Sequence, residues 1–371
     1  MSMERRLSVV REGWDGVSCY VHARIAAHGK DLLLTAQRLN TAGNDDFDGL
    51  EAAVSRDGGA HWTDFAPVKG FESHEREGGI RTVASDMTPL WHRASGRFLV
   101  TGHTVDYDIG SDRPVDPFRR TRIIPYATYD PGTGAWSPVK SVVMPEGNVY
   151  ADCGSGCSQC FELPDGGLLV PVSYREKADG RAKNAMTQVL RCTFDGETLA
   201  AAEFGNPLGV EEEVRGLGEA SVIGCGGRFY LTLRGDTHGY VSVSEDGLHY
   251  TQPEIWRWDD GEILPTYNTQ SHFLTLGGRL YLVYTRKNGH NDHVFRHRAP
   301  LYLGEVDPDR LCVIRSSECV VIPERGARLG NFGAANDGPD LAYISASEWM
   351  QPKTCAAYGS NNALWLCTLR A

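Results

Sequence analysis

Residues 55–62 read SRDGGAHW, a complete S-x-D-x-G-x-x-W motif. In such a turn the aspartate can accept hydrogen bonds from nearby backbone N–H groups. The glycines permit positive φ angles, and the tryptophan packs beneath the turn. A shortened copy lies at residues 244–250, and a degenerate one lies at residues 129–136. These motifs predict tight turns between antiparallel strands, and we assign them no chemistry.

Six similar units follow one another along the chain. Each has a polar residue, an apolar strand, a turn containing Gly or Asp, and a second apolar strand. In the first unit, Arg24–Ala27 turns at Gly29 into Asp31–Ala36. The β-branched and aromatic residues that flank the turns are typical of β-hairpins.

The repeat has an interval of roughly 50–70 residues, which predicts a radial all-β fold. We expect one domain over residues 1–371, a six-bladed β-propeller with four antiparallel strands in each blade. Residues 5–12 are expected to close the ring by adding the outer strand of the last blade. Two β-sandwiches would fit the even spacing less well. The expected blades span residues 18–70, 80–145, 155–205, 215–261, 265–324 and 328–371.

Composition narrows the classes of function. The net charge is −11 and charged residues make up 23% of the chain, which argues against nucleic-acid and anionic-membrane partners. No apolar run is long enough to span a membrane, and no signal peptide is visible, so we expect a cytoplasmic protein. Ten cysteines are too dilute for a disulfide framework. No metal-ligand motif is found, and we expect neither a metal nor a cofactor.

The first residue of every inner strand is polar. In a propeller these strands begin near the central axis, so their first residues should line one cavity. Such a ring favours a ligand site, although the same residues could instead hydrogen-bond water in the central tunnel. The six residues are Arg24, Asp86, Gln159, Glu219, Gln270 and Asn331.

Arginines near the ends of inner strands indicate the kind of ligand. Arg24, Arg38, Arg234 and Arg298 lie at such positions. Arginines that converge on one pocket can hold a carboxylate or sulfate through paired N–H donors. A surface ion pair is the alternative for each of them.

The chain resembles the sialidase (neuraminidase) superfamily, six-bladed propellers that carry Asp-box (BNR) repeats. The resemblance spans residues 18–370 and is strongest at Ala23–Ile25, at residues 55–62, and at Glu219–Val222 followed by Arg234. It implies hydrolysis of a glycosidic bond to a terminal acidic sugar. It also implies three arginines that grip the substrate carboxylate, namely Arg24, Arg234 and Arg298, with Arg296 as the alternative to the last.

The same resemblance implies catalytic roles. Glu219 matches the residue that activates a tyrosine nucleophile, and Asp46 or Asp48 matches the acid that protonates the leaving oxygen. Asp86 matches a residue that contacts substrate, and Glu348 matches a carboxylate that orients the first arginine.

The nucleophile departs from the family pattern. The segment Leu329–Gly333 has Asn331 where the family has its tyrosine, and Tyr267 is the substitute that we consider. Without the tyrosine, either Glu219 or an aspartate activates water in an inverting hydrolysis, or the sugar is not sialic acid.

Two other classes of protein remain open. Polysaccharide lyases and rhamnose–uronate hydrolases with similar propellers use His and Tyr on a uronic-acid glycan, and His272 with Tyr267 and Arg298 would serve that chemistry. A non-catalytic carbohydrate-binding propeller would keep the arginines but lack the carboxylates. All three readings predict an acidic carbohydrate as the partner, and they leave the oligomeric state open.

Overall fold

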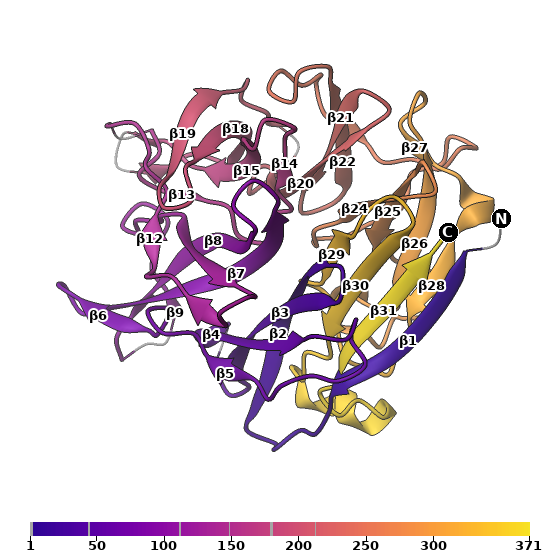
Figure 1. Cartoon of the computed structure of the whole chain (residues 1–371), viewed down its shortest axis with the longest axis horizontal. Helices are drawn as coiled ribbons and strands as arrows, with labels where there is room; N and C mark the ends of the chain where they lie inside the picture. The colour runs from indigo at the N-terminus through magenta and orange to yellow at the C-terminus, as the bar shows by residue number, and fades with distance from the viewer. Residues whose placement is uncertain (1–2, 44, 111–112, 148, 179–180, 212) are drawn as a thin grey trace.

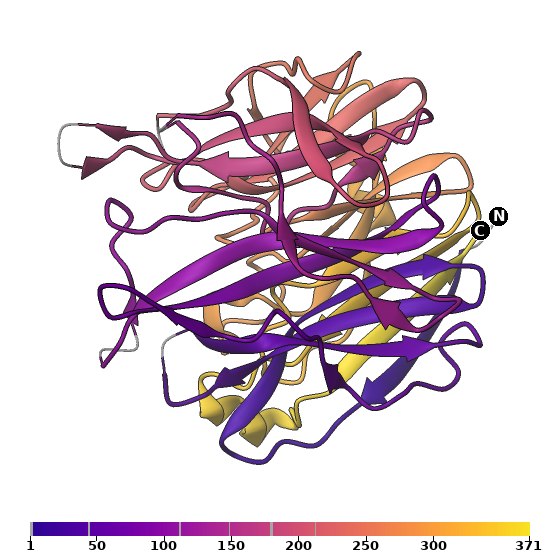
Figure 2. The same ribbon diagram turned by 60° about the vertical axis from the view of Figure 1, so that its left-hand side comes forward.

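The computed structural model describes residues 3–43, 45–110, 113–147, 149–178, 181–211 and 213–371. It confirms the expected fold class: antiparallel sheets form six blades around a centre, as Figure 1 shows, and the turned view in Figure 2 shows the depth of the blades. Within these residues, no helix is both long and apolar enough to cross a membrane.

The first three blades follow chain order, and extra short strands join the second and third. Blade 1 contains β2 (Ser18–His28), β3 (Asp31–Asn40), β4 (Asp46–Ser55) and β5 (Ala66–Pro67). Blade 2 contains β7 (Ile80–His92), β8 (Arg97–Asp108), β10 (Pro125–Asp130) and β11 (Ala135–Trp136), with β6 (His74–Arg76), β9 (Arg113–Pro114) and β12 (Lys140–Ser141) at its margins. Blade 3 contains β13 (Cys153–Gly154), β14 (Phe161–Glu162), β15 (Leu168–Tyr174), β18 (Met186–Phe194) and β19 (Leu199–Phe204), and the hairpin of β16 (Lys177–Ala178) and β17 (Arg181–Ala182) follows β15.

The last three blades repeat the same order. Blade 4 contains β20 (Gly218–Cys225), β21 (Arg228–Arg234), β22 (Gly239–Ser244) and β23 (Glu254–Ile255). Blade 5 contains β24 (His272–Leu276), β25 (Arg279–Tyr284), β26 (Leu301–Asp307), β27 (Cys312–Val313) and β28 (Cys319–Ile322). Blade 6 contains β29 (Gly333–Asn336), β30 (Leu341–Ser347), β31 (Leu364–Arg370) and β1 (Glu4–Arg11). Three short 3-10 helices lie at Phe295–His297, Arg315–Ser317 and Lys353–Tyr358.

The N-terminal strand supplies the outer strand of the last blade. β1 pairs antiparallel with β31 from Glu4 opposite Arg370 to Arg11 opposite Leu364. The two ends of the chain therefore lie side by side, which Figure 1 shows at the right of the view. This pairing joins the first strand of the chain to the last and closes the ring of blades.

The hydrophobic core is divided among the contacts between neighbouring blades. Leu33 of blade 1 packs with Phe98 and Val100 of blade 2, and Tyr230 of blade 4 packs with Phe273 of blade 5. Apolar burial between sheets is the main stabilising contribution. The axis is therefore left free for polar residues.

The turn at residues 55–62 has the hydrogen bonds that its sequence predicts. Asp57 Oδ1 accepts from the backbone N–H of His61 at 2.9 Å, and Ser55 Oγ accepts from the N–H of Gly59 at 2.9 Å. The indole of Trp62 donates to the carbonyl of Gly59 at 3.3 Å. The turn is fixed by its own residues and takes no part in the site described next.

Candidate active site

Each blade has a non-glycine residue with positive φ within its inner strand or shortly before it. Register shifts accompany three of these residues, in β2 between Val21 and Arg24, in β7 between Ser85 and Thr88, and in β20 between Gly218 and Ser221. Residues other than glycine rarely adopt a positive φ, and those that do are concentrated at functional sites. The six are His22 (φ 56°), Asp86 (53°), Cys157 (58°), Glu219 (47°), Asn268 (49°) and Asn331 (63°).

The six polar residues predicted from the sequence therefore belong to two different rings. Asp86, Glu219 and Asn331 occupy the positive-φ positions. The other three predicted residues, Arg24, Gln159 and Gln270, each lie two positions further along the chain. A bulge adds a residue to one strand of a pair, so a fixed count from the turn cannot place both sets. The positive-φ residues that the count missed are His22, Cys157 and Asn268.

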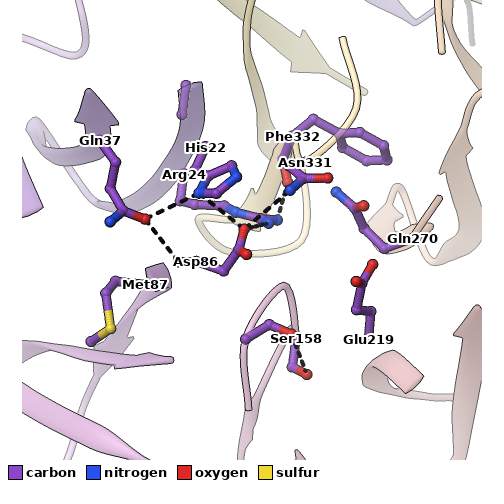
Figure 3. A network of polar contacts seen from close by, with 12 residues as sticks. His22, Arg24, Gln37, Asp86, Met87, Ser158, Glu219, Gln270, Asn331 and Phe332 are labelled. Atoms are coloured by element: carbon purple, nitrogen blue, oxygen red, sulfur yellow. Dashed lines mark hydrogen bonds and ion pairs between the residues drawn. The ribbon is translucent and has the colours of Figure 1, made fainter. Parts of the chain in front are cut away.

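Arg24 is completely buried and is bound between blades. Its Nη2 donates to Oδ1 of Asp86 at 3.2 Å, and its Nη1 donates to the carbonyl of Phe332 and lies 2.9 Å from Nε2 of His272. Figure 3 shows the guanidinium beside Asp86, with Asn331 and Phe332 next to it. The sequence predicted that Arg24 binds a substrate carboxylate. In the structure its side chain contacts other residues of the protein instead.

Gln159, Gln270 and His272 also link blades. Gln159 exchanges two hydrogen bonds with the backbone of Phe273, at 2.9 and 3.0 Å. In the amide orientation that gives both its oxygen and its nitrogen a partner, Gln270 accepts from the backbone N–H groups of Asn331 and Phe332, at 2.8 and 3.1 Å. The buried His272 contacts Ser221 Oγ at 2.6 Å in addition to Arg24. Together with Arg24 they form an axial layer of polar links between blades, which gives them a structural role where the sequence predicted substrate contacts.

Two adjoining cavities open beside the positive-φ ring. One has a volume of about 320 Å³ and is lined by Glu219, Arg234 and further arginines. The other has a volume of about 190 Å³ and is lined by Asp45 and Asp86. They share His103, Arg120 and Arg122. We call the two cavities together the cleft.

Asp86 joins the axial layer to the cleft. Its Oδ1 lies 3.2 Å from His22 Nδ1 and 3.3 Å from Asn331 Nδ2, and its Oδ2 lies 3.9 Å from His103 Nε2. Burial raises the pKa of the Asp86 carboxyl, but the nearby His22, Arg24 and His103 outweigh it and hold that pKa well below its usual range. The group is therefore a carboxylate at neutral pH.

Glu219 is held by Arg234. Arg234 donates from Nη1 to Glu219 Oε1 and from Nη2 to the side-chain oxygen of Asn268. Burial raises the pKa of Glu219, but Arg234 outweighs it, so the net shift is downward. The other oxygen, Oε2, is buried and has no hydrogen-bond partner among the described residues.

Arg298 lies beside this pair. It donates from Nη2 to the backbone carbonyl of Asn268, so Asn268 binds both Arg234 and Arg298. Burial and the charge of Arg234 lower the pKa of Arg298 well below its ordinary value. The structure thus brings together two of the three arginines that the resemblance implied, while Arg24 lies in the axial layer.

His103 is a cleft residue that the predicted ring did not include. Its side chain is 15% exposed and lines both cavities. A Cβ atom at Gly156 would overlap the imidazole, so the glycine leaves the space that His103 occupies. Burial and the positive charges of Arg122 and Arg120 lower the pKa of His103 to about 4. The imidazole is therefore neutral at neutral pH and could accept a proton.

The aspartate loop presents a different residue to the cleft from the two predicted as the acid. Asp45 lines the smaller cavity, and none of the described residues hydrogen-bonds its carboxylate. Asp46 is bound by Arg81, and Asp48 is exposed. Side chains alternate along β4, and Asp45 adopts a positive φ of 53° just before that strand begins. This local conformation decides which aspartate meets the cleft.

Three other predicted site residues have partners elsewhere. Arg38 donates to Glu51 at 3.2 Å, because its side chain points to the opposite face of β3 from Gln37, which bonds the backbone of Asp86. Glu348 accepts from Arg325 at 2.6 and 2.9 Å instead of orienting Arg24. Tyr267 lies under the ammonium group of Lys287, 4.0 Å from the ring centre, and lines neither cavity.

Metal chemistry has no assembled site here. Within the described residues, no group of three or more His, Cys, Asp or Glu side chains is arranged to hold a metal ion. All ten cysteines are free thiols.

Solved structures share this fold over nearly the whole chain. A protein of unknown function from Dyadobacter fermentans DSM 18053 superposes with a TM-score of 0.69 at 14% identity, covering 99% of both chains. Trypanosoma rangeli sialidase in complex with the inhibitor DANA gives 0.64 at 15% identity, covering 99% of this chain and 59% of that one. A Hadza microbial sialidase gives 0.69 at 13% identity, covering 98% and 68%.

These likenesses show the shared propeller fold alone, because the identities are low. The chain spans only 59% of the length of the Trypanosoma rangeli sialidase structure. No protein-family model matches the chain, and no curated protein matches it. Membership of the sialidase superfamily, including its Asp-box repeat, therefore stays a prediction.

Proposed function

We propose that the cleft hydrolyses the glycosidic bond of a terminal acidic sugar, sialic acid or a related carboxylated sugar. The observation that carries this proposal is Glu219, an ionised carboxylate with one unpartnered buried oxygen in a cavity lined by arginines. Propeller structures of sialidases at low identity support the choice of reaction class.

Each residue of the cleft has a separate role in the proposed hydrolysis. Arg234, with Arg298 beside it, binds the carboxylate of the sugar through charge-assisted hydrogen bonds. Glu219 acts as the base that activates water, since its lowered pKa keeps it ionised. Asp45 acts as the acid for the leaving oxygen. Asp86 stabilises positive charge that develops on the sugar ring in the transition state.

The residue at position 331 favours a mechanism in which water attacks the anomeric carbon directly. Asn331 occupies the place where the resemblance implies a tyrosine, and its amide is bound to Asp86 at 3.3 Å. An amide is a poor nucleophile, and Tyr267 lies outside the cleft. We therefore propose an inverting reaction, in which one carboxylate activates water and another protonates the leaving group.

A fluorogenic assay tests this function. The purified protein is incubated with the 4-methylumbelliferyl glycosides of sialic acid and of glucuronic acid. We expect the protein to release the fluorophore and Glu219→Gln to abolish that release. Glu305→Gln is the control and should keep full activity, since Glu305 on β26 is paired with Arg279 on β25. Saturable binding of acidic glycans without any turnover would contradict hydrolysis and favour a carbohydrate-binding propeller.

His103 favours a lyase as the second candidate. A lyase needs a neutral base near the proton α to a carboxylate, together with a cation that neutralises that carboxylate. His103 has a pKa of about 4 and is surrounded by Arg120 and Arg122, so it offers both features. An absorbance rise from unsaturated uronate on polyuronates, lost in His103→Gln, would replace hydrolysis with this reaction. His272, the base suggested by the sequence, is buried in the axial layer.

A further inference from the structure

Among the described residues, four arginines line the larger cavity in addition to Arg234. We call them the arginine wall. It draws residues from the loop between β9 and β10, from the end of β15, and from the loop before β20. Its members are Arg120, Arg122, Arg175 and Arg215.

The wall has more positive charge than its acidic neighbours neutralise. Arg120 and Arg122 share one buried carboxylate, Asp152, at 3.1 and 2.6 Å. Arg215 is paired with Asp236. Four guanidinium groups therefore face two carboxylates.

Arg175 is the member without an ionic partner. Its two terminal nitrogens donate to the backbone carbonyls of Lys183 and Arg215, at 2.8 and 3.0 Å. No carboxylate of the described residues lies within ion-pair distance of Arg175, and its Nε is buried without a hydrogen-bond partner.

The arginines of the wall disfavour one another's charged forms. Burial and the charge of Arg122 lower the pKa of Arg120 to about 10. The same two causes lower the pKa of Arg175. Partly buried cations that outnumber their counter-charges are destabilising, and an anion in the cavity would reduce that destabilisation.

We propose that the arginine wall is a subsite for a second anionic group of the same glycan, a carboxylate or a sulfate ester. The substrate would then be a glycan with at least two negative charges, one at Arg234 and one at the wall. The identity of the first group rests on the proposed function, whereas anion binding at the wall does not. Arg234 lines the same cavity, so one ligand can meet both.

Calorimetric binding with matched ligands tests the subsite. The carboxylate ligands are sialic acid with its α2,8-linked disaccharide, and galacturonate with digalacturonate. For the sulfate ester, the pair is galacturonate with galacturonate 2-sulfate. We expect the ligand with two charges to bind about tenfold more tightly than its singly charged partner, which corresponds to one added charge-assisted hydrogen bond. The pair that shows the gain identifies the group as carboxylate or sulfate.

Variants assign the gain to the wall. Arg175→Gln should remove the tenfold advantage and leave the affinity for the singly charged ligand unchanged. Arg215→Gln, at an exposed position, provides a second variant if Arg175→Gln does not fold. Arg191→Gln is the matched control, since it removes an arginine paired with Asp165 and Glu203 on the outer part of blade 3.

The outcomes separate the two proposals. An Arg175-dependent preference for two charges, without turnover of any glycoside, keeps the subsite and overturns the hydrolase. Equal affinities within every pair, or a preference that both Arg175→Gln and Arg215→Gln retain, overturns the subsite whether or not the protein turns over substrate.

Discussion

The axial layer and the cleft use the same polar residue types for opposite purposes. In the axial layer, Arg24 and Gln270 direct their hydrogen bonds to other blades, so the side chains hold the ring together. In the cleft, Glu219 keeps an unpartnered oxygen, and Arg175 has no ionic partner among the described residues. A positive-φ residue of the ring and its axial neighbour lie only two positions apart in the chain, as His22 and Arg24 do. Arg24 also has an Nε without a partner in the described part of the chain, but of these three residues only Glu219 and Arg175 line the larger cavity. The difference teaches that polarity near the axis does not by itself mark a binding residue, whereas an unpartnered polar group on a residue that lines a cavity does.

The largest expected effect is on the cleft side. Glu219→Gln should lower turnover by about 10²–10⁴-fold, because it removes the base. The free energy of unfolding should change by less than about 1 kcal/mol, since Arg234 keeps its bond to Asn268. Steady-state kinetics and urea unfolding on one preparation check both. A large loss of stability would place Glu219 with the axial layer.

The reverse pattern is expected for the axial layer. Arg24→Met should lower the free energy of unfolding by about 3–5 kcal/mol, because it leaves the buried Asp86 without the arginine that pairs with its charge. Arg38→Met, which breaks a partly exposed pair with Glu51, should cost less than about 1 kcal/mol. Urea unfolding measures both. Comparable losses in the two variants would contradict the structural role of Arg24.

A smaller effect separates neighbouring aspartates of one loop. Asp45→Asn should reduce turnover of a natural glycoside by about a hundredfold, because protonation of the leaving oxygen is lost. An aryl glycoside has a good leaving group and should be affected less. Asp48→Asn, at an exposed position, is the matched control and should retain activity. Equal activity of Asp45→Asn and the wild type on both substrates would remove Asp45 from the mechanism.

The smallest effect is a pH dependence of stability. Burial lowers the pKa of His103 to about 4, below the ordinary histidine value of about 6.5, so the unfolded chain takes up a proton first. Stability contributed by the neutral imidazole is present above about pH 6.5 and is lost as the pH falls toward 4. Asp86, Glu219, Arg120 and Arg122 face this group.

Two other histidines share the direction of this shift. Burial also lowers the pKa of His22 and of His272. Protonation of all three histidines should therefore lower the stability of the wild type as the pH falls. His103→Gln should remove only part of the slope between pH 6.5 and 4 in thermal unfolding. An unchanged slope in the variant would show that His103 titrates normally in the folded protein.

Much of the fold could be predicted from the sequence because its signals are local. The turn at residues 55–62 is fixed by hydrogen bonds among its own residues, and the hairpin repeat follows from strand propensity and glycine turns. Glu219 and Arg234 were also predicted together, since they lie on paired strands of a single blade. Each of these features involves residues close in the chain.

The tertiary structure decided the site. Bulges determined that Glu219 meets the cleft while Arg24 is buried in the axial layer, and the geometry of one loop selected Asp45 over Asp46 and Asp48. His103 and the arginine wall come from separate blades and loops, and no sequence motif predicts that they line one cleft. The sequence by itself determined six hairpins and their turns, because those depend on neighbours along the chain. The chemistry at the axis depends on contacts between blades, and only closure of the ring brings those contacts into being.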